Sequence, residues 1–326
     1  MLTTRAYPRA THFDYAVEKG VNVFMEKSFS PDPGGLHRMR RAGEAAKKKN
    51  LKIAAGLQCR HSVARQALIE KIRNGELGSV DLIRAYRMGG GGSMGPHKPD
   101  DKELERQIRG SCAVLWASSG LMIELLIHQI DECCWIKDAW PVTAHGLGGD
   151  LPHSNDCSQN LHSYSMEYTF PDGTAALVGN RNVTGCYNDF ATYILGSQRA
   201  AQFSGNVHAA TVHTYKDKRV DKANIDWKAD KEPCNPWQAE WNDLIDAIRN
   251  DKPYNETERA MLSNLAAVMG RAAVHSGKLI TWDQMMSSTF RFCDYVDKMD
   301  YDSPPPVMPD DQGRYPAPTP GRWTEI

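Results

Sequence analysis

The chain has 326 residues, and its 39 lysine and arginine residues nearly balance its 40 aspartate and glutamate residues, giving a formal net charge of −1. The two signs are interspersed without a basic stripe, which excludes nucleic acid as the expected partner. No apolar run reaches the length of a membrane span, so we expect no membrane association. Eight scattered cysteines form no Cys-x-x-Cys pair, which argues against a zinc site and favours reduced thiols in the cytoplasm.

Helix and strand patterns alternate over the first ninety residues. Short apolar runs typical of buried strands lie at residues 21–25, 51–57 and 80–87. Helical patterns separate them at residues 12–19, from Pro31 and Pro33 to about Lys49, and at residues 62–74. This alternation predicts a parallel sheet covered by helices.

A glycine-rich stretch, MGGGGSMGPHKP, follows at residues 88–99. It has no periodicity, so it predicts either a solvated surface loop or a flap over a site. No Gly-Lys-Ser/Thr sequence and no helix start follow it directly, which excludes a phosphate-binding loop. His97 in this stretch is a solvated side chain in the first interpretation and a substrate ligand in the second.

Residues 118–136, SSGLMIELLIHQIDECCWI, predict one buried helix because they are apolar nearly all round. Glu124, His128 and Asp131 interrupt the apolar surface at a spacing that places all three on one face. Burying ionisable groups is costly unless they are paired or used. Three interpretations follow: a hydrogen-bonded ladder, an acid–base histidine steered by a carboxylate at the floor of a pocket, or a metal site. The spacing is not His-Glu-x-x-His and further ligands are not evident, so we expect no metal.

The second half of the chain begins strand-rich and ends helical. Short strand patterns separated by turn signals predict a mostly antiparallel open sheet, followed by helices at residues 236–250, 256–276 and from Trp282 to about Met299. The tail from Ser303 is proline-rich and is predicted to be extended. The fold class is therefore a partial Rossmann-type parallel sheet followed by a domain with a large open sheet and covering helices. The predicted domains are residues 1–79, 80–282, a helix at 283–301 that packs back on the first domain, and the tail at 302–326.

Several of these stretches together resemble the Gfo/Idh/MocA oxidoreductase family. THFDYAVEKGVNVFMEKSFS is similar to the family's helix–strand unit that ends in Glu-Lys-Pro, and GLMIELLIHQID resembles its Asp-x-Gly-x-His-x-x-Asp helix. NDLIDAIRNDKPY and LITWDQM resemble its C-terminal segments. The resemblance covers nearly the whole chain, with the two motifs in the family's order.

The resemblance implies hydride transfer between NAD or NADP and a carbon of a sugar, polyol or related carbohydrate. It implies that Lys27 and His128 supply acid–base chemistry at the reacting hydroxyl. The spacing on the helix adds Glu124 as the carboxylate expected to orient the histidine. Cofactor contacts are expected from Thr4, Arg5, His12, Glu26 and Lys27, and substrate contacts from Arg60, His97 and Asp131. It also implies a homo-oligomer formed through the open sheet.

The chain departs from the family pattern at both motifs. Ser28 replaces the motif proline, so a cis peptide at this position would cost about 2.5–4 kcal/mol. Glu124 replaces aspartate and Leu126 replaces glycine, which suggests a reshaped pocket. The family's first strands and its glycine-rich nucleotide turn are expected before Met1, so the sequence is interpreted as beginning near the fourth Rossmann strand, without half of the dinucleotide domain.

Two other functions are compatible with the same residues. One is NAD-dependent cleavage of a glycosidic bond, in which the oxidation is transient and no NADH accumulates. The other is a catalytically silent sugar-binding or assembly subunit. The presence of both Lys27 and His128 favours catalysis, whereas the expected loss of the nucleotide half favours the silent subunit.

Overall fold

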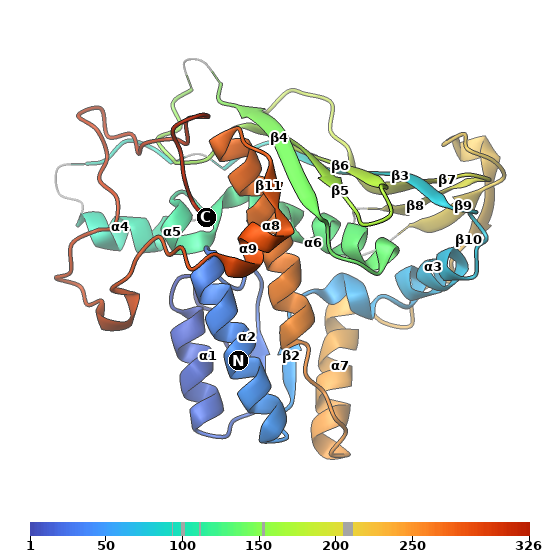
Figure 1. The fold of residues 1–326 in the computed structure, drawn as a ribbon, viewed down its shortest axis with the longest axis horizontal. Helices are drawn as coiled ribbons and strands as arrows, with labels where there is room; N and C mark the ends of the chain where they lie inside the picture. Colours follow the sequence, from blue (N-terminus) through green and yellow to red (C-terminus); the bar gives the residue numbers. More distant parts are fainter. Residues whose placement is uncertain (93, 99–101, 111, 152–153, 205–210) are drawn as a thin grey trace.

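Two sheets organise the structure, a computed structural model that describes residues 1–326 except 93, 99–101, 111, 152–153 and 205–210 (Figure 1). The smaller sheet pairs two parallel strands, β1 (Val23–Met25) and β2 (Ile53–Ala55), in which every residue is buried. The predicted strand at the N-terminus is reduced to a single bridge between Leu2 and Met25.

Helices cover this small sheet, but the third strand predicted for it, at residues 80–87, lies instead in the larger sheet as β3 (Val80–Gly89). α1 (Arg9–Glu18) and α2 (Pro33–Lys48) lie side by side, with α7 (Pro236–Arg249) across the strands from them (Figure 1). Pro33 occupies the first turn of α2, and the Asp32 carboxylate caps the helix by accepting from the main-chain N of Gly35 at 2.9 Å.

Within the described residues, the larger sheet has nine strands in the order β10-β9-β8-β7-β3-β6-β5-β4-β11. All neighbouring pairs are antiparallel except β3 with β6, which confirms the predicted mixed fold class. The strands are β3 (Val80–Gly89), β4 (Thr143–Gly149), β5 (Ser163–Thr169), β6 (Ala175–Asn182), β7 (Phe190–Gly196), β8 (Ala200–Ser204), β9 (Val212–Tyr215), β10 (Ile225–Lys228) and β11 (Ile280–Thr281).

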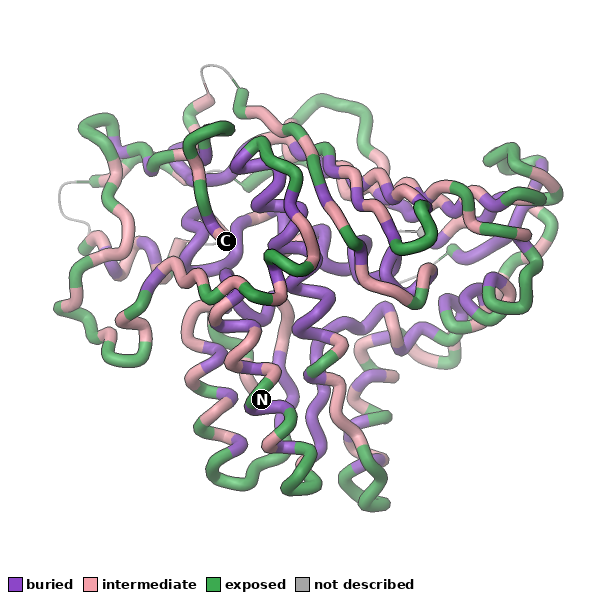
Figure 2. Tube along the Cα trace, in the orientation of Figure 1, coloured by how far each residue is buried: buried purple, intermediate pink, exposed green. Residues whose placement is uncertain are grey.

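Two long buried helices, α6 (Gly120–Lys137) and α8 (Thr257–Ser276), lie between the sheets and form much of the core (Figure 2). α8 approaches β5 so closely that a Cβ at Gly270 would lie 1.9 Å from the Tyr168 hydroxyl. Shorter helices complete the chain: η1 (Gln58–His61), α3 (Val63–Arg73), α4 (Glu103–Arg109), α5 (Leu115–Ser118), η2 (Lys222–Asn224), α9 (Trp282–Ser287) and η3 (Val296–Lys298).

The prediction of one helix from Trp282 to about Met299 is wrong. α9 ends at Ser287, and the following main chain bonds to the start of α2 instead of continuing the helix. The Phe290 carbonyl accepts from Gly34 N at 3.0 Å, and Phe292 N donates to the Asp32 carboxylate at 3.1 Å. These two main-chain groups thus have partners at the start of α2 instead of partners within a helix.

The proline-rich tail is extended, as predicted, and its end is buried against the chain itself. Glu325 is 1% exposed, and its carboxylate accepts from Arg271 Nε at 2.7 Å and lies 3.0 Å from His275 Nδ1, both on α8. None of the eight cysteines, all of them described, forms a disulfide. Among the described residues, no helix combines the length and apolarity that crossing a membrane requires.

Candidate active site

Lys27 and Glu124 form an ion pair at the point where β1 meets α6. Lys27 follows β1, and the peptide bond between Lys27 and Ser28 is cis. Lys27 Nζ donates to Glu124 Oε2 at 2.6 Å and to the Glu124 main-chain O at 2.8 Å. The two side chains are 23% and 18% exposed, so the pair is accessible to a small molecule.

Two of the departures from the family pattern contact each other here. Ser28, in place of the motif proline, donates its hydroxyl to Glu124 Oε1 at 2.9 Å. The same Ser28 hydroxyl lies 3.0 Å from the hydroxyl of Ser119, which in turn donates to the Ser30 carbonyl at 3.1 Å. The position of Ser119 at the start of α6 predicts that its side chain caps the helix. Instead, the side chain forms no capping hydrogen bond and anchors this turn.

Arg9 fixes the turn from the other side, a role that no sequence pattern indicates. This buried guanidinium donates to the main-chain carbonyls of Thr4, Glu26 and Ser28. Burial lowers the pKa of Arg9 to about 10, which leaves it charged at neutral pH. Arg9 thus holds the N-terminal segment and the Lys27 turn in one arrangement.

His128 lies on the same helix as Glu124, but among the described residues no hydrogen bond joins the two side chains. Glu124 extends toward the N-terminal end of α6, where Lys27 and Ser28 bind its carboxylate, so the expected orienting contact is not formed. The Nδ1 atom of His128 is buried and has no hydrogen-bond partner among the described residues. Burial and the nearby charge of Lys27 lower the pKa of His128 to about 3, so the imidazole is neutral at physiological pH.

Three of the five predicted cofactor residues line one cavity of about 550 Å³. Thr4, Arg5 and His12 form part of its wall, together with Tyr7 and five residues near the C-terminus: Val296, Asp297, Met299, Asp300 and Tyr301. Glu26 and Lys27 are not in this wall. Glu26 lies instead beside the end of β2, where a Cβ at Gly56 would be 2.9 Å from its Oε2.

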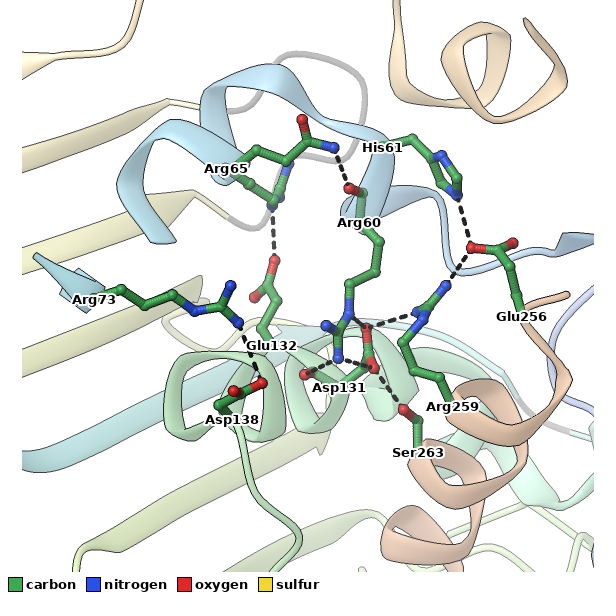
Figure 3. A network of polar contacts seen from close by, with 11 residues as sticks. Arg60, His61, Arg65, Arg73, Asp131, Glu132, Asp138, Glu256, Arg259 and Ser263 are labelled. Atoms are coloured by element: carbon green, nitrogen blue, oxygen red, sulfur yellow. Dashed lines mark hydrogen bonds and ion pairs between the residues drawn. The ribbon is translucent and has the colours of Figure 1, made fainter. Parts of the chain in front are cut away.

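Arg60 and Asp131 form a bidentate ion pair at the other end of α6 (Figure 3). Arg60 Nε and Nη2 donate to the Asp131 carboxylate at 2.8 and 2.9 Å, and the guanidinium lies 4.7 Å from the Trp135 ring centre. Ser263 donates to the same carboxylate at 2.5 Å. Burial raises the pKa of Asp131, but the Arg60 charge outweighs it and the net pKa is lowered. The substrate role of these two residues stays a prediction.

His97 lies apart from the residues described above. Its Nε2 is 3.2 Å from Glu103 Oε2 on α4, and the glycine at position 313 of the tail packs against its main chain. Residues 93 and 99 of the glycine-rich stretch lie outside the described residues. The flap and the substrate contact of His97 therefore stay predictions.

No family model matches the chain, and no curated protein matches it. Several solved structures, in contrast, are similar to this chain in fold. Aldose–aldose oxidoreductase from Caulobacter crescentus has a TM-score of 0.67 at 15% identity, with 85% of this chain and 77% of that one covered. UDP-N-acetylglucosamine 3-dehydrogenase from Acidithiobacillus ferrooxidans has 0.61 at 20% identity, covering 83% and 77%. Myo-inositol 2-dehydrogenase from Lactobacillus plantarum has 0.61 at 16% identity, covering 86% and 78%. These similarities confirm the predicted fold class, and the chain has the two-sheet fold of Gfo/Idh/MocA-type oxidoreductases.

Proposed function

We propose that this protein is an NAD(P)-dependent oxidoreductase that acts on a hydroxyl-bearing carbon of a sugar, a polyol or a related carbohydrate. The observation that carries the proposal is the Lys27–Glu124 pair at 2.6 Å, partly exposed at the carboxyl end of a parallel strand and close enough to His128 for its charge to lower the histidine pKa. Open parallel sheets bind ligands at this edge. The solved structures of the same fold include enzymes named for aldose and inositol oxidation.

The ion pair supports proton transfer at a hydroxyl. As Lys27 Nζ accepts the hydroxyl proton, it passes one of its own protons to the Glu124 carboxylate across the 2.6 Å contact. Loss of that proton and of a hydride from the carbon converts the alcohol into a carbonyl. In the reverse direction, Lys27 returns the proton to the oxygen. Ser28 holds the carboxylate throughout, because it binds the Glu124 oxygen that Lys27 does not.

His128 acts in this scheme as a neutral hydrogen-bonding group. Its low pKa keeps it uncharged, and the unpartnered Nδ1 can bind the substrate oxygen or a water that replaces it. An uncharged imidazole beside Lys27 avoids placing two positive charges in one buried site.

The cavity lined by Thr4, Arg5 and His12 is the part of the surface that we assign to a nicotinamide cofactor. Its volume lies in the range of small-molecule sites, and Thr4, Arg5 and His12 offer hydroxyl, guanidinium and imidazole donors for ribose and phosphate oxygens. Arg9 connects this wall to the Lys27 turn through the carbonyls that it binds. The cofactor, when bound, supplies the hydride acceptor.

The first test is a titration of the folded 326-residue chain with NADH and with NADPH, followed by fluorescence or calorimetry. We expect saturable binding of one of them that an Arg5→Ala substitution weakens. Screening of aldoses and polyols with the oxidised cofactor should then give accumulating reduced cofactor. Reduced cofactor would not accumulate in a glycoside-cleaving enzyme, and a folded chain that binds neither cofactor would contradict the proposal.

A further inference from the structure

A second cluster of ionisable side chains lies beyond the end of β2. His61 of η1, Glu240 of α7 and Glu256, which directly precedes α8, each place one donor atom so that all three atoms lie within 4.8 Å of one another. His61 Nε2 and Glu256 Oε1 are 3.4 Å apart (Figure 3). The second Glu256 oxygen accepts from the main-chain N of Ala55 at 3.0 Å, which fixes this carboxylate on the strand end.

Glu240 is the member of the cluster that the protein alone leaves unexplained. It is 0% exposed, and neither of its carboxylate oxygens has a hydrogen-bond partner among the described residues. A buried carboxylate without a partner is costly, and buried polar groups in native proteins nearly always have one. Its position within reach of His61 Nε2 and Glu256 indicates that a ligand between the three donors supplies the missing interaction.

His61 is held in the manner of a metal-binding histidine. Its Nδ1 lies 2.6 Å from the Asp243 carboxylate, on the side of the ring opposite to the cluster. A carboxylate on one ring nitrogen fixes the tautomer and leaves the lone pair of the other nitrogen free, which is the usual support of a metal ligand. Here that other nitrogen, Nε2, points toward Glu256 (Figure 3).

The net charge around the cluster is negative enough to be neutralised by a divalent cation. Asp243, Glu240 and Glu256 carry three negative charges when ionised, and Arg259, which donates to Glu256, supplies one positive charge. The balance of these four residues is −2 while His61 is neutral. One doubly charged cation would neutralise it.

We propose that His61, Glu240 and Glu256 form a binding site for one divalent transition-metal ion of the Zn²⁺ type. One imidazole nitrogen with two carboxylate oxygens suits Zn²⁺ and Co²⁺ better than Mg²⁺ or Ca²⁺, which prefer oxygen alone. Donors bound at about 2.1 Å in a tetrahedron lie about 3.4 Å apart, which matches the His61–Glu256 distance. The ion would join η1 to α7 and to the start of α8, outside the Lys27–Glu124 pair.

The competing explanation for the buried cluster is that protons bound to its side chains, and not a metal ion, neutralise the negative charge. Burial raises the pKa of Glu240 to about 8, so this carboxyl can hold a proton at neutral pH, and a second proton on His61 would complete the balance. That arrangement predicts a folded protein that takes up no metal. The two explanations therefore differ in a direct measurement.

The full chain is first dialysed against a chelator and then titrated with Co²⁺, and binding is monitored by visible absorption. We expect one equivalent of bound Co²⁺, with ligand-field bands and without the thiolate charge-transfer band that binding to the cysteines would give. Removing an outer partner of a metal ligand already costs 10–100-fold in affinity, so Glu240→Gln should weaken binding at least ~100-fold. Asp246→Asn, a half-exposed carboxylate on the same helix, should leave binding unchanged.

Two results would overturn the proposal. One is a folded wild-type chain that takes up no Co²⁺ or Zn²⁺, and the other is a Glu240→Gln variant that binds as tightly as wild type. Anomalous diffraction at the cobalt edge from wild-type crystals gives an answer that does not depend on how the variant folds. The ion must lie between His61, Glu240 and Glu256, and an ion found elsewhere contradicts the site.

Discussion

Two parts of α6 carry similar ionisable residues that differ in exposure and in how completely they are hydrogen-bonded. At the end near β1, Glu124 pairs with a partly exposed Lys27, and His128 keeps an unpartnered ring nitrogen. One turn further on, Asp131 is 1% exposed and accepts from Arg60 and Ser263. The first group retains polar atoms that a ligand can bind, whereas the second has its hydrogen bonds supplied from within the chain.

This difference separates reactivity from support. Buried polar groups that are fully paired fix the packing of the elements that carry them. Polar groups left incomplete in an accessible position are candidates for chemistry, because a substrate can complete them. We therefore assign the partly exposed Lys27 to the reaction, together with the buried His128 near it, and we expect the Asp131 network chiefly to hold α6 against η1 and α8.

The largest effect that we expect is on stability, at the buried end of α6. Asp131→Ala leaves the Arg60 guanidinium without its carboxylate, and breaking such a pair from one side costs about 3–5 kcal/mol. Urea unfolding measures this loss. Asp138→Asn is the control, since among the described residues that exposed aspartate pairs only with the half-exposed Arg73, and asparagine tolerates the positive φ of 49° there, so stability should change by less than about 1 kcal/mol.

A double variant sharpens the comparison. Replacing both partners, Arg60→Met with Asp131→Leu, removes the unpaired charge and should recover most of the lost stability. If the recovered protein keeps its KM for substrate, the network is structural. A raised KM would instead support the substrate role predicted for Arg60 and Asp131.

The C-terminal tail contributes to a third cluster, made of Arg271, His275 and Glu325, which is buried and hydrogen-bonded within the chain like the Asp131 network. Burial raises the pKa of Glu325, but the Arg271 charge and the hydrogen bonds from Arg271 and His275 outweigh it and lower that pKa to about 2. The unfolded value is higher, so the stabilisation is present above pH 5 and is lost as the pH falls toward 2. Glu325→Gln should therefore cost about 3 kcal/mol at pH 7. Its unfolding free energy should depend less on pH than that of wild type between pH 5 and 2, and equal slopes would contradict the assignment.

The sequence could predict those features that a local pattern determines. The apolar periodicity of residues 118–136 identified α6 as a buried helix, and its polar spacing placed Glu124, His128 and Asp131 on it. Lys27 could be placed at a strand end because the strand before it is a short apolar run. The antiparallel pairing of β5 with β6 followed from the turn at Pro171, Asp172 and Gly173 between them.

Contacts between distant segments could not be predicted in this way. Arg9 binds main-chain carbonyls, which leave no mark in the sequence of their own residues. The donors of the His61 cluster come from three separate elements that only the fold brings together. β9 is four buried residues without alternation, so its pattern does not distinguish a strand from a loop.

The accessible end of α6 should respond in activity rather than in stability. Lys27→Met removes the proposed proton acceptor, and turnover should fall at least ~100-fold, the usual scale of general acid–base groups. The ion pair is partly exposed, so the free energy of unfolding should change by only about 1 kcal/mol. Lys19→Met, at a half-exposed lysine that pairs with Glu18, is the control and should keep full turnover. Normal turnover of Lys27→Met would remove Lys27 from the mechanism.

His128 tests whether the accessible end works with a neutral histidine. His128→Ala should lower turnover ~100-fold, the usual scale for losing one hydrogen bond to the reacting oxygen, whereas His145→Ala, at an exposed histidine on β4, should not. Because the pKa of His128 lies near 3, its protonation is complete only well below physiological pH. A plot of kcat/KM against pH for wild type should therefore show no inflection near pH 6.5 that can be attributed to His128, that is, none that disappears in His128→Ala. Such an inflection would mean that His128 takes up a proton in the working range, and that its role is acid–base exchange rather than hydrogen bonding.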